Sequence, residues 1–211
     1  MKKIAIIGAN GKSGKELVKE ALLQGYEVTA IVRNKEYKND KVKIVYKDVF
    51  ELNKEDLSEF DVVISAFAVW TKETFYLHAK HTKHLADLLS SSKTRLFIVG
   101  GAGTLYVDSD RKVMLMDAPD FPTEYLDVAK ADAGSFYELK DRKDTLWTYV
   151  SPALNYDENG ARTGKYKIGS DKIILNSNNQ SYISYPDLAL AIIDEIKNQN
   201  HINRCLTAVS G

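Results

Sequence analysis

Three glycines near the start of the chain have the spacing of a phosphate-binding turn. They occur in the stretch GANGKSG, after the apolar run KIAII and before a segment with helical periodicity. The N-terminus of a helix favours anions such as a pyrophosphate, because its N–H groups are unpaired and its dipole is positive there. Gly8 would permit the tight turn, Gly11 the close approach of the phosphates, and Gly14 the packing of helix on strand. The candidate contacts of this predicted dinucleotide turn are Gly8, Asn10, Gly11, Lys12, Ser13 and Gly14.

A different phosphate-binding loop, that of the nucleotide hydrolases, does not fit these residues. That loop has four residues between its glycines, and a lysine followed by serine or threonine completes it. Here Gly8 and Gly14 are farther apart, and Glu16 follows Lys15. The alternative that remains is a glycine turn with no ligand.

An arginine at the end of the second apolar run bears on the choice of dinucleotide. In NAD-binding folds, an acidic residue about 20 positions beyond the glycines holds the ribose 2′-hydroxyl. Arg33 stands there instead, 19 residues after Gly14. A guanidinium binds phosphate as a planar fork, whereas a carboxylate would repel it. The sequence therefore favours NADP(H) over NAD(H), with Lys12, Ser13 and Asn34 as further contacts. The alternative is a solvated surface arginine.

A parallel sheet must position these residues, and the alternation of apolar runs with helical stretches predicts one. Six strands are predicted at 3–8, 27–33, 42–48, 61–68, 95–101 and 145–152, and helices at 12–25, 72–90 and 123–141. Two short strands around a polar turn are predicted within 171–187, with a helix from there to about 198 that begins at Ser184. We predict an α/β, doubly wound Rossmann fold with helices on both faces. Residues 1–211 would form a single domain, in which about 156–211 form a substrate-side C-terminal subregion.

Composition limits the partners of the chain. There are 29 basic and 29 acidic residues among 211, so the formal net charge is zero, which argues against nucleic-acid and anionic-membrane partners. The single cysteine, Cys205, cannot form an internal disulfide and fits a reducing compartment. The N-terminal apolar run ends at Ala9 and is better explained as a strand than as a signal peptide. We expect a cytoplasmic monomer or homodimer that binds a small molecule.

Several stretches together resemble one known family. They are GANGKSG, the arginine after the second strand, KDVF, SAFA, VGGAG, SPALN, GKYKIGSD and SYISYPDLALAIIDEI, and they cover nearly the whole chain. The chain resembles the atypical short-chain dehydrogenase/reductases, and more narrowly the NADH-flavin reductase group related to biliverdin reductase B and the NmrA-like proteins. The resemblance implies cofactor contacts at Asp48 and Val49 (adenine), at Ser65, Ala66 and Phe67, at Gly100, Gly101 and Ala102 (nicotinamide ribose), and at Ser151, Pro152 and Leu154 (nicotinamide).

The chain departs from the usual catalytic motif of the dehydrogenases, Tyr-x-x-x-Lys. Two residues four apart share a helix face, so that the lysine can lower the tyrosine pKa. Here Tyr125 and Lys130 are five apart, about 140° around a helix. The fifth strand also lacks the usual catalytic serine, and Thr104 is the nearest hydroxyl. Tyr125 and Thr104 are therefore weak catalytic candidates, and Tyr125 is expected in the core or against the substrate.

Hydride transfer to a flavin needs no such acid, because the ring takes the hydride and solvent can supply the proton. Phe67, Trp70, Tyr106 and Tyr156 fall in predicted loops at the carboxyl edge of the sheet and could stack on a flat acceptor or anchor loops. The favoured hypothesis is an NAD(P)H-dependent reductase of a flavin or quinone. The alternatives are an NmrA-like NADP sensor without turnover and an epimerase or dehydratase, which the absent Tyr-x-x-x-Lys disfavours.

Three histidines, His78, His81 and His84, lie on the helix predicted at 72–90. Two histidines one turn apart can ligate zinc, but no Cys, Asp or Glu pattern completes a site nearby. We expect hydrogen-bonded helix histidines and no metal.

Overall fold

One eight-stranded sheet forms the centre of the computed structural model, which describes residues 2–211. The strand order is β3-β2-β1-β4-β5-β6-β10-β8, and β7 and β9 form a separate pair. The strands are β1 (Lys3–Ile7), β2 (Glu27–Val32), β3 (Lys43–Tyr46), β4 (Val62–Ser65), β5 (Arg95–Val99), β6 (Leu146–Val150), β7 (Asn155–Asp157), β8 (Tyr166–Gly169), β9 (Tyr182–Ser184) and β10 (Arg204–Ser210). The α-helices are α1 (Lys12–Leu23), α2 (Lys54–Leu57), α3 (Leu77–Leu88), α4 (Thr123–Leu139) and α5 (Tyr185–Asn198).

In this sheet every pair of neighbours from β3 across to β10 is parallel, and only β8, at the far edge, pairs antiparallel, with β10. Parallel strands covered on both faces are apolar throughout, and β1 (KIAII) is such a strand. Ile4 pairs with Val28 on one side and with Val62 on the other, so β1 lies at the middle of the sheet. The predicted doubly wound Rossmann fold is confirmed.

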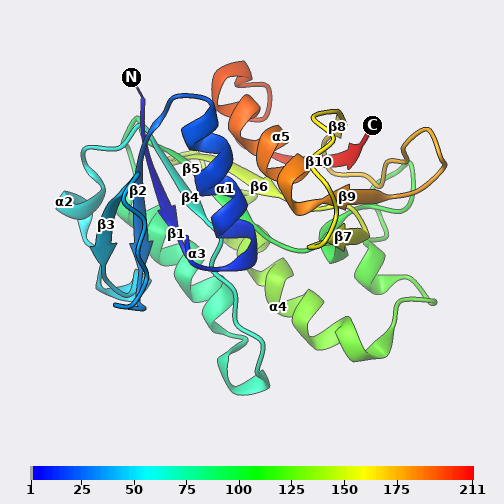
Figure 1. The fold of residues 1–211 in the computed structure, drawn as a ribbon. Coiled ribbons are helices and arrows are strands. Elements are labelled where there is room, and N and C mark those ends of the chain that lie inside the picture. Colours follow the sequence, from blue (N-terminus) through cyan, green and yellow to red (C-terminus); the bar gives the residue numbers. More distant parts are fainter. Residues whose placement is uncertain (1) are drawn as a thin grey trace.

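Helices cover both faces of the sheet, with α1 and α5 on one side and α3 and α4 on the other (Figure 1). The first pair buries Leu17 of α1 and Ile192 of α5 against the sheet, and the second buries Leu85 of α3 and Leu139 of α4. The two helices of each pair also pack on each other, α1 on α5 and α3 on α4. Within residues 2–211, no helix is both long and apolar enough to cross a bilayer.

The structure departs from the predicted elements at several places, and the short elements α2, β7 and β8 were not predicted. The helix predicted over 72–90 begins only at Leu77, after a 3-10 turn at Lys72–Thr74. The first strand predicted within 171–187 is wrong, because Lys172 forms an isolated bridge with Tyr106 and no ladder. The last strand, β10, was not predicted, although it is buried between β6 and β8.

The C-terminal segment joins the main sheet through β10 and β8 and covers it with α5. Ser184 caps α5 as predicted, since its hydroxyl accepts a hydrogen bond from the Asp187 N–H at 3.2 Å. The Asp187 carboxylate is buried, and it accepts from the N–H groups of Thr163 and Gly164, each at 3.0 Å. These bonds fix the 160–165 loop beside the start of α5.

Candidate functional site

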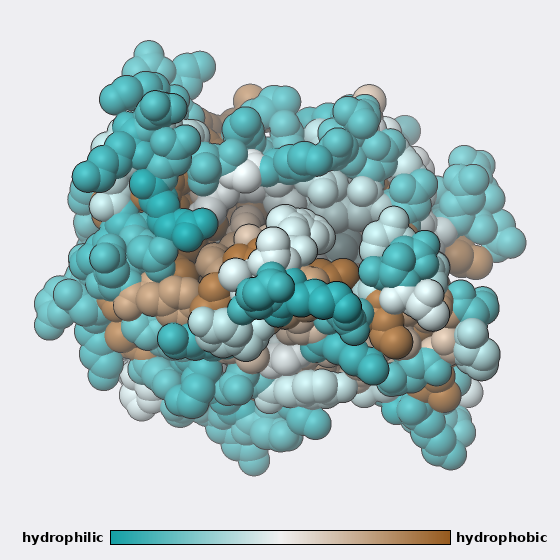
Figure 2. Space-filling model, turned by 90° about the horizontal axis from the view of Figure 1, so that it is seen from below, coloured by the Kyte–Doolittle hydropathy of each residue, from teal (hydrophilic) through white to brown (hydrophobic). Residues whose placement is uncertain are grey.

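A cavity of about 550 Å³ lies where the strand order of the sheet reverses, between β1 and β4. In doubly wound sheets, ligands bind at this point, outside the carboxyl ends of the strands. The cavity, here named the switch-point cavity, is lined by Ile7, Gly8, Asn10, Gly11, Lys12, Ser13, Ile31, Val32, Arg33, Asn34, Lys47, Val49, Ala66, Phe67, Ala68, Trp70 and Tyr185. Figure 2 shows a hollow on this side of the molecule, in which apolar side chains are exposed between polar ones.

The glycine turn connects β1 to α1 at the inner end of the cavity. Gly8 has a φ of +74°, which a residue with a side chain rarely adopts, and its N–H donates to the Ile31 carbonyl at 3.0 Å. The Gly11 N–H donates to the Gly8 carbonyl at 2.9 Å and closes the turn. A Cβ on Gly14 would lie 2.1 Å from the Gly8 oxygen, so Gly14 is required for helix and turn to touch.

Gly11 leaves open the space that a pyrophosphate needs. Its φ of −74° and ψ of 174° are available to any residue, and a Cβ there would meet only the Gly8 oxygen at 3.2 Å. Gly11 is also the N-cap of α1, where no side chain accepts from the first N–H groups and the first turn has no acidic residue, within the described part of the chain. The residues present therefore fit an anion at the start of α1.

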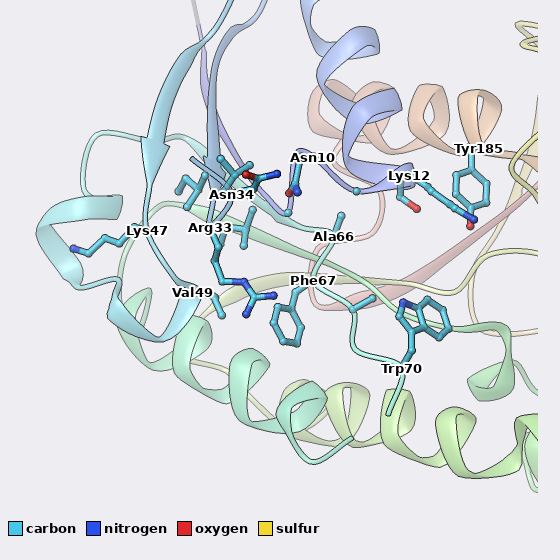
Figure 3. Close-up of a pocket in the computed structure, with 17 residues that line it drawn as sticks. Asn10, Lys12, Arg33, Asn34, Lys47, Val49, Ala66, Phe67, Trp70 and Tyr185 are labelled. Atoms are coloured by element: carbon cyan, nitrogen blue, oxygen red, sulfur yellow. The ribbon is translucent and has the colours of Figure 1, made fainter. Parts of the chain in front are cut away.

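Two neighbouring side chains of the turn bind the C-terminal segment. The ammonium group of Lys12 forms an ion pair with Glu158, and this hydrogen bond and charge raise the pKa of Lys12. The Ser13 hydroxyl lies 3.0 Å from the Tyr156 hydroxyl, and the Tyr156 ring stacks on Tyr185 at 3.7 Å between centroids. Lys12 and Tyr185 both reach the cavity (Figure 3).

Arg33 extends into the cavity from the end of β2 (Figure 3). Its side chain is 71% exposed, and its guanidinium lies 3.5 Å from the Asp48 carboxylate, which also caps the following 3-10 turn by accepting from the Phe50 N–H. Asn34 lies beside Arg33 on the cavity wall. Lys47 is also on this wall and forms an ion pair with Asp56 at 2.5 Å. Arg33, Asn34 and Lys47 are thus the polar residues of the wall on which a ribose 2′-phosphate is expected.

Aromatic side chains line the opposite wall, on the loop that follows β4. Phe67 packs on His81 at 4.4 Å between ring centroids and is held edge-on by Phe50 at 6.2 Å. Trp70 also lines the cavity and is 77% exposed, and its indole lies to the right of Phe67 in Figure 3. The wall therefore combines a ring held by its neighbours, Phe67, with a solvent-exposed ring, Trp70.

Several residues named from the sequence lie outside this cavity. Ser65 is fully buried, and Gly14 and Asp48 play the structural parts described above. The nicotinamide-side residues belong to the segments after β5 and β6, farther along the same edge; they are Gly100, Gly101, Ala102, Ser151, Pro152 and Leu154. A Cβ on Gly100 would lie 2.0 Å from the Tyr149 hydroxyl, which gives this glycine a packing reason of its own. Their contacts with a cofactor stay predictions.

The two weak catalytic candidates are not placed at the cavity. Tyr125 is 59% exposed, so it is not a core residue, and it does not line the switch-point cavity. It lies in the first turn of α4, whereas the buried positions of that helix begin at Ala129. Thr104 is buried, and its hydroxyl donates to the Gly101 carbonyl at 3.2 Å and lies 2.9 Å from the Ser151 hydroxyl.

Two of the four proposed stacking residues anchor loops instead. Tyr156 is engaged with Ser13 and Tyr185, as described above, and burial raises its pKa. Tyr106 bridges to Met114 and Lys172 through its backbone. Phe67 and Trp70 line the cavity.

The three histidines of α3 each have hydrogen-bond partners. The His81 ring lies 3.2 Å from the Leu77 carbonyl, and burial lowers its pKa to about 3. His84 reaches the Leu52 carbonyl at 3.1 Å, and His78 lies between Asp132 and Val69. Among residues 2–211, no group of three potential metal ligands occurs.

Sequence reasoning missed six lining residues, namely Ile7, Ile31, Val32, Lys47, Ala68 and Tyr185. Lys47 directly precedes Asp48 in the stretch KDVF, and Ala68 ends the stretch SAFA, so both motifs carried a usable signal. Tyr185 follows Asn34 by 151 residues in the chain and reaches the cavity only through the fold of the C-terminal segment, so no local signal marked it.

Comparisons with known proteins agree with this geometry. A family described as NAD(P)H-binding matches residues 8–199. The uncharacterized protein YwnB of Bacillus subtilis (strain 168) is 45% identical over 210 residues, which is 99% of this chain and 98% of that protein.

Two solved structures share this fold over nearly the whole chain. The crystal structure of a proposed NADH-flavin reductase from Streptococcus pneumoniae TIGR4 is 41% identical and superposes with a TM-score of 0.96, covering 100% of both chains. That of a proposed epimerase from Bacteroides thetaiotaomicron is 34% identical, with a TM-score of 0.85, covering 99% of this chain and 97% of the other.

Proposed function

This chain belongs to the NAD(P)H-binding family, and from that premise we propose that it is an NADPH-dependent reductase of a flat aromatic acceptor such as a flavin or quinone. The observation that carries the proposal is the switch-point cavity. It joins a glycine turn suited to a pyrophosphate, an exposed arginine suited to a 2′-phosphate, and an aromatic wall suited to a flat ring. The similarity to a proposed NADH-flavin reductase supports the acceptor class.

Each part of the dinucleotide has a candidate partner in the chain. The open start of α1 at Gly11, together with Lys12, would hold the pyrophosphate. Arg33, Asn34 and Lys47 would bind the adenosine 2′-phosphate, and Val49 would contact the adenine. The nicotinamide would then extend toward the segments after β4 and β5. In this placement Arg33 exchanges its contact with Asp48 for one with the phosphate.

The chain's contribution to the reaction is placement rather than acid catalysis. Bound NADPH supplies a hydride, which carries two electrons, and solvent supplies the proton that completes reduction of the acceptor. Phe67 and Trp70 would form one wall against which the acceptor lies, and the glycine turn would fix the donor. Holding two reactants in a reactive geometry can lower the activation free energy by roughly 7–11 kcal/mol in well-oriented cases.

The proposal is tested by mixing the protein with NADPH and a flavin or quinone and following the loss of NADPH absorbance. We expect acceptor-dependent oxidation of NADPH. Tight NADP(H) binding without any turnover would favour the NADP-sensing alternative, in which the cavity reports on the dinucleotide and does not use it.

Removal of the Tyr125 hydroxyl should have little effect. General acid–base catalysis contributes typically 10²–10⁴-fold, so loss of a true catalytic acid would be plain. Because Tyr125 is exposed and away from the cavity, Tyr125→Phe should change kcat/KM with NADPH and a flavin by less than about ten-fold. Lys130→Ala should be equally mild. A loss of a hundred-fold in Tyr125→Phe, with folding intact, would show that the hydroxyl acts in the transition state.

Trp70 should contribute to acceptor binding. A stacked aromatic pair is worth about 0.5–1.5 kcal/mol beyond its buried area, so Trp70→Ala should raise the KM for a flavin by roughly two- to ten-fold. The KM for NADPH should change less. Tyr76→Ala is the matched control, because Tyr76 is also exposed, at 64%, but does not line the cavity. Equal effects of both variants on the flavin KM would contradict a stacking role.

A further inference from the structure

A buried histidine connects the aromatic wall of the cavity to the helix layer behind it. His78 lies in the first turn of α3, and only 3% of it is exposed. Its Nδ1 atom is 2.9 Å from the Asp132 carboxylate on α4, and its Nε2 atom is 3.0 Å from the carbonyl oxygen of Val69. Val69 is in the loop after β4, between Ala68 and Trp70, which both line the switch-point cavity.

Both neighbours of the ring accept hydrogen bonds and cannot donate them. A neutral imidazole has one N–H, so it can satisfy only one of the two, whereas an imidazolium donates to both. Burial lowers the pKa of His78, but the hydrogen bond and the charge of Asp132 and the bond to Val69 outweigh it, and the pKa is raised above its ordinary value of 6.5. The geometry thus fits the protonated ring.

Asp132 extends this connection to a second loop of the site. A Cβ on Gly101, in the segment after β5, would lie 2.6 Å from the other carboxylate oxygen of Asp132. The partly buried Asp132 carboxylate therefore lies beside the segment after β5 and reaches the loop after β4 through His78. The resemblance implies cofactor contacts in both segments, at Phe67 after β4 and at Gly101 after β5.

We propose that His78 is a positioning residue, whose imidazolium ties the aromatic wall at Val69 to Asp132 and so holds Phe67 and Trp70 in place for the acceptor. The consequence for turnover rests on the proposed function, whereas the tie itself does not. Deprotonation removes one of the two hydrogen bonds and leaves a lone pair facing the other acceptor. Whichever bond is lost, the connection between Asp132 and the loop carrying Trp70 is broken.

The titratable groups around the His78 ring decide whether the tie weakens or strengthens as pH rises. Asp132 faces it from α4, His81 neighbours it on α3, and Tyr149 of β6 donates to the Asp132 carbonyl at 3.1 Å. His81, with its pKa near 3, stays neutral over the working range, and Tyr149 has a raised pKa. Because the His78 pKa is raised in the folded protein, the tie is complete at low pH and is lost as pH rises through that pKa.

The first test uses the loop's own tryptophan and needs neither cofactor nor turnover. The chain has two tryptophans, and Trp147 is 3% exposed in the core, so the difference in emission anisotropy between the wild type and Trp70→Phe isolates Trp70. We expect this anisotropy to fall as pH rises, with a midpoint above 6.5. In Asp132→Asn the midpoint should move to lower pH. In His84→Gln, which changes a neighbouring helix histidine bonded to Leu52, it should stay unchanged.

A second variant keeps the test decisive if Asp132→Asn does not fold. His78→Gln cannot donate at both ends, so its Trp70 signal should be low and independent of pH. A flat signal in the wild type, or an unmoved midpoint in a folded Asp132→Asn protein, would overturn the proposal.

The second test is the pH profile of turnover. For a flavin acceptor, kcat/KM should fall by roughly five- to ten-fold through the same midpoint, as loss of one hydrogen bond would give. His78→Gln should remove this fall. If the wild type shows no turnover at all, the proposed function fails while the Trp70 signal still tests the tie. If turnover is present with no such midpoint, the tie has no part in positioning the acceptor.

Discussion

Gly11→Val is expected to lower the affinity for NADP(H) by at least about a hundred-fold while the protein stays folded. The valine side chain would occupy the space in which a pyrophosphate approaches the start of α1, and each charge-assisted bond lost there costs about 1.5–3 kcal/mol. The backbone of Gly11 has a conformation open to any residue, and its one close contact is at 3.2 Å. Isothermal calorimetry for binding and thermal denaturation for stability would measure the two effects.

Gly14→Ala is the matched contrast within the same motif. Its Cβ would lie 2.1 Å from the Gly8 oxygen and does not face the cavity, so it should destabilise the fold itself. Normal NADP(H) binding by Gly11→Val would refute the pyrophosphate placement. If Gly11→Val unfolds, Gly11→Ala adds a smaller side chain at the same position and should still weaken binding measurably.

Arg33→Ala is expected to weaken NADP(H) by roughly ten- to a hundred-fold and to leave NAD(H) almost unchanged. The two dinucleotides differ by the 2′-phosphate, and a lost charge-assisted contact with a phosphate costs about 1.5–3 kcal/mol. The Arg33 side chain is 71% exposed and lines the cavity, so it is available to a ligand despite its contact with Asp48. Dissociation constants for both dinucleotides, measured with both proteins, give the selectivity ratio.

Lys12→Ala is the control for a general effect of positive charge. Lys12 lies at the glycine turn, so its removal should weaken NADP(H) and NAD(H) by similar factors. Equal losses of both dinucleotides in Arg33→Ala would contradict the assignment of the 2′-phosphate to Arg33.

The central fold could be predicted because its signals are local. The run KIAII is buried on both faces of β1, and the glycines after it enforce a turn that only a helix start can follow. The glycine turn, Arg33 and the SAFA segment each follow a predicted parallel strand, and the structure places residues of all three in one cavity. The alternation of strands and helices then predicted that the strands run in parallel.

What could not be predicted depends on contacts between distant segments. The strand β10 follows α5 and pairs with β6, which lies more than 50 residues earlier, and its sequence RCLTAVS carries weak periodicity. Helical spacing put Tyr125 on the face of Ala129, but in the first turn of α4 it is Leu126 that packs on the core, and Tyr125 is 59% exposed. The His78 tie needs α4 and the loop after β4 to meet α3, and no motif records that meeting.

Anaerobic mixing of the protein with NADPH and a flavin tests the central claim most directly. The absorbances of NADPH and of oxidised flavin would be followed together, so that the transfer of reducing equivalents is seen with no oxygen to reoxidise the product. The account predicts that one flavin is reduced for each NADPH consumed, at a rate that rises with protein concentration and is largely lost in Gly11→Val. Tight NADP(H) binding with no protein-dependent reduction of flavin or quinone would contradict it.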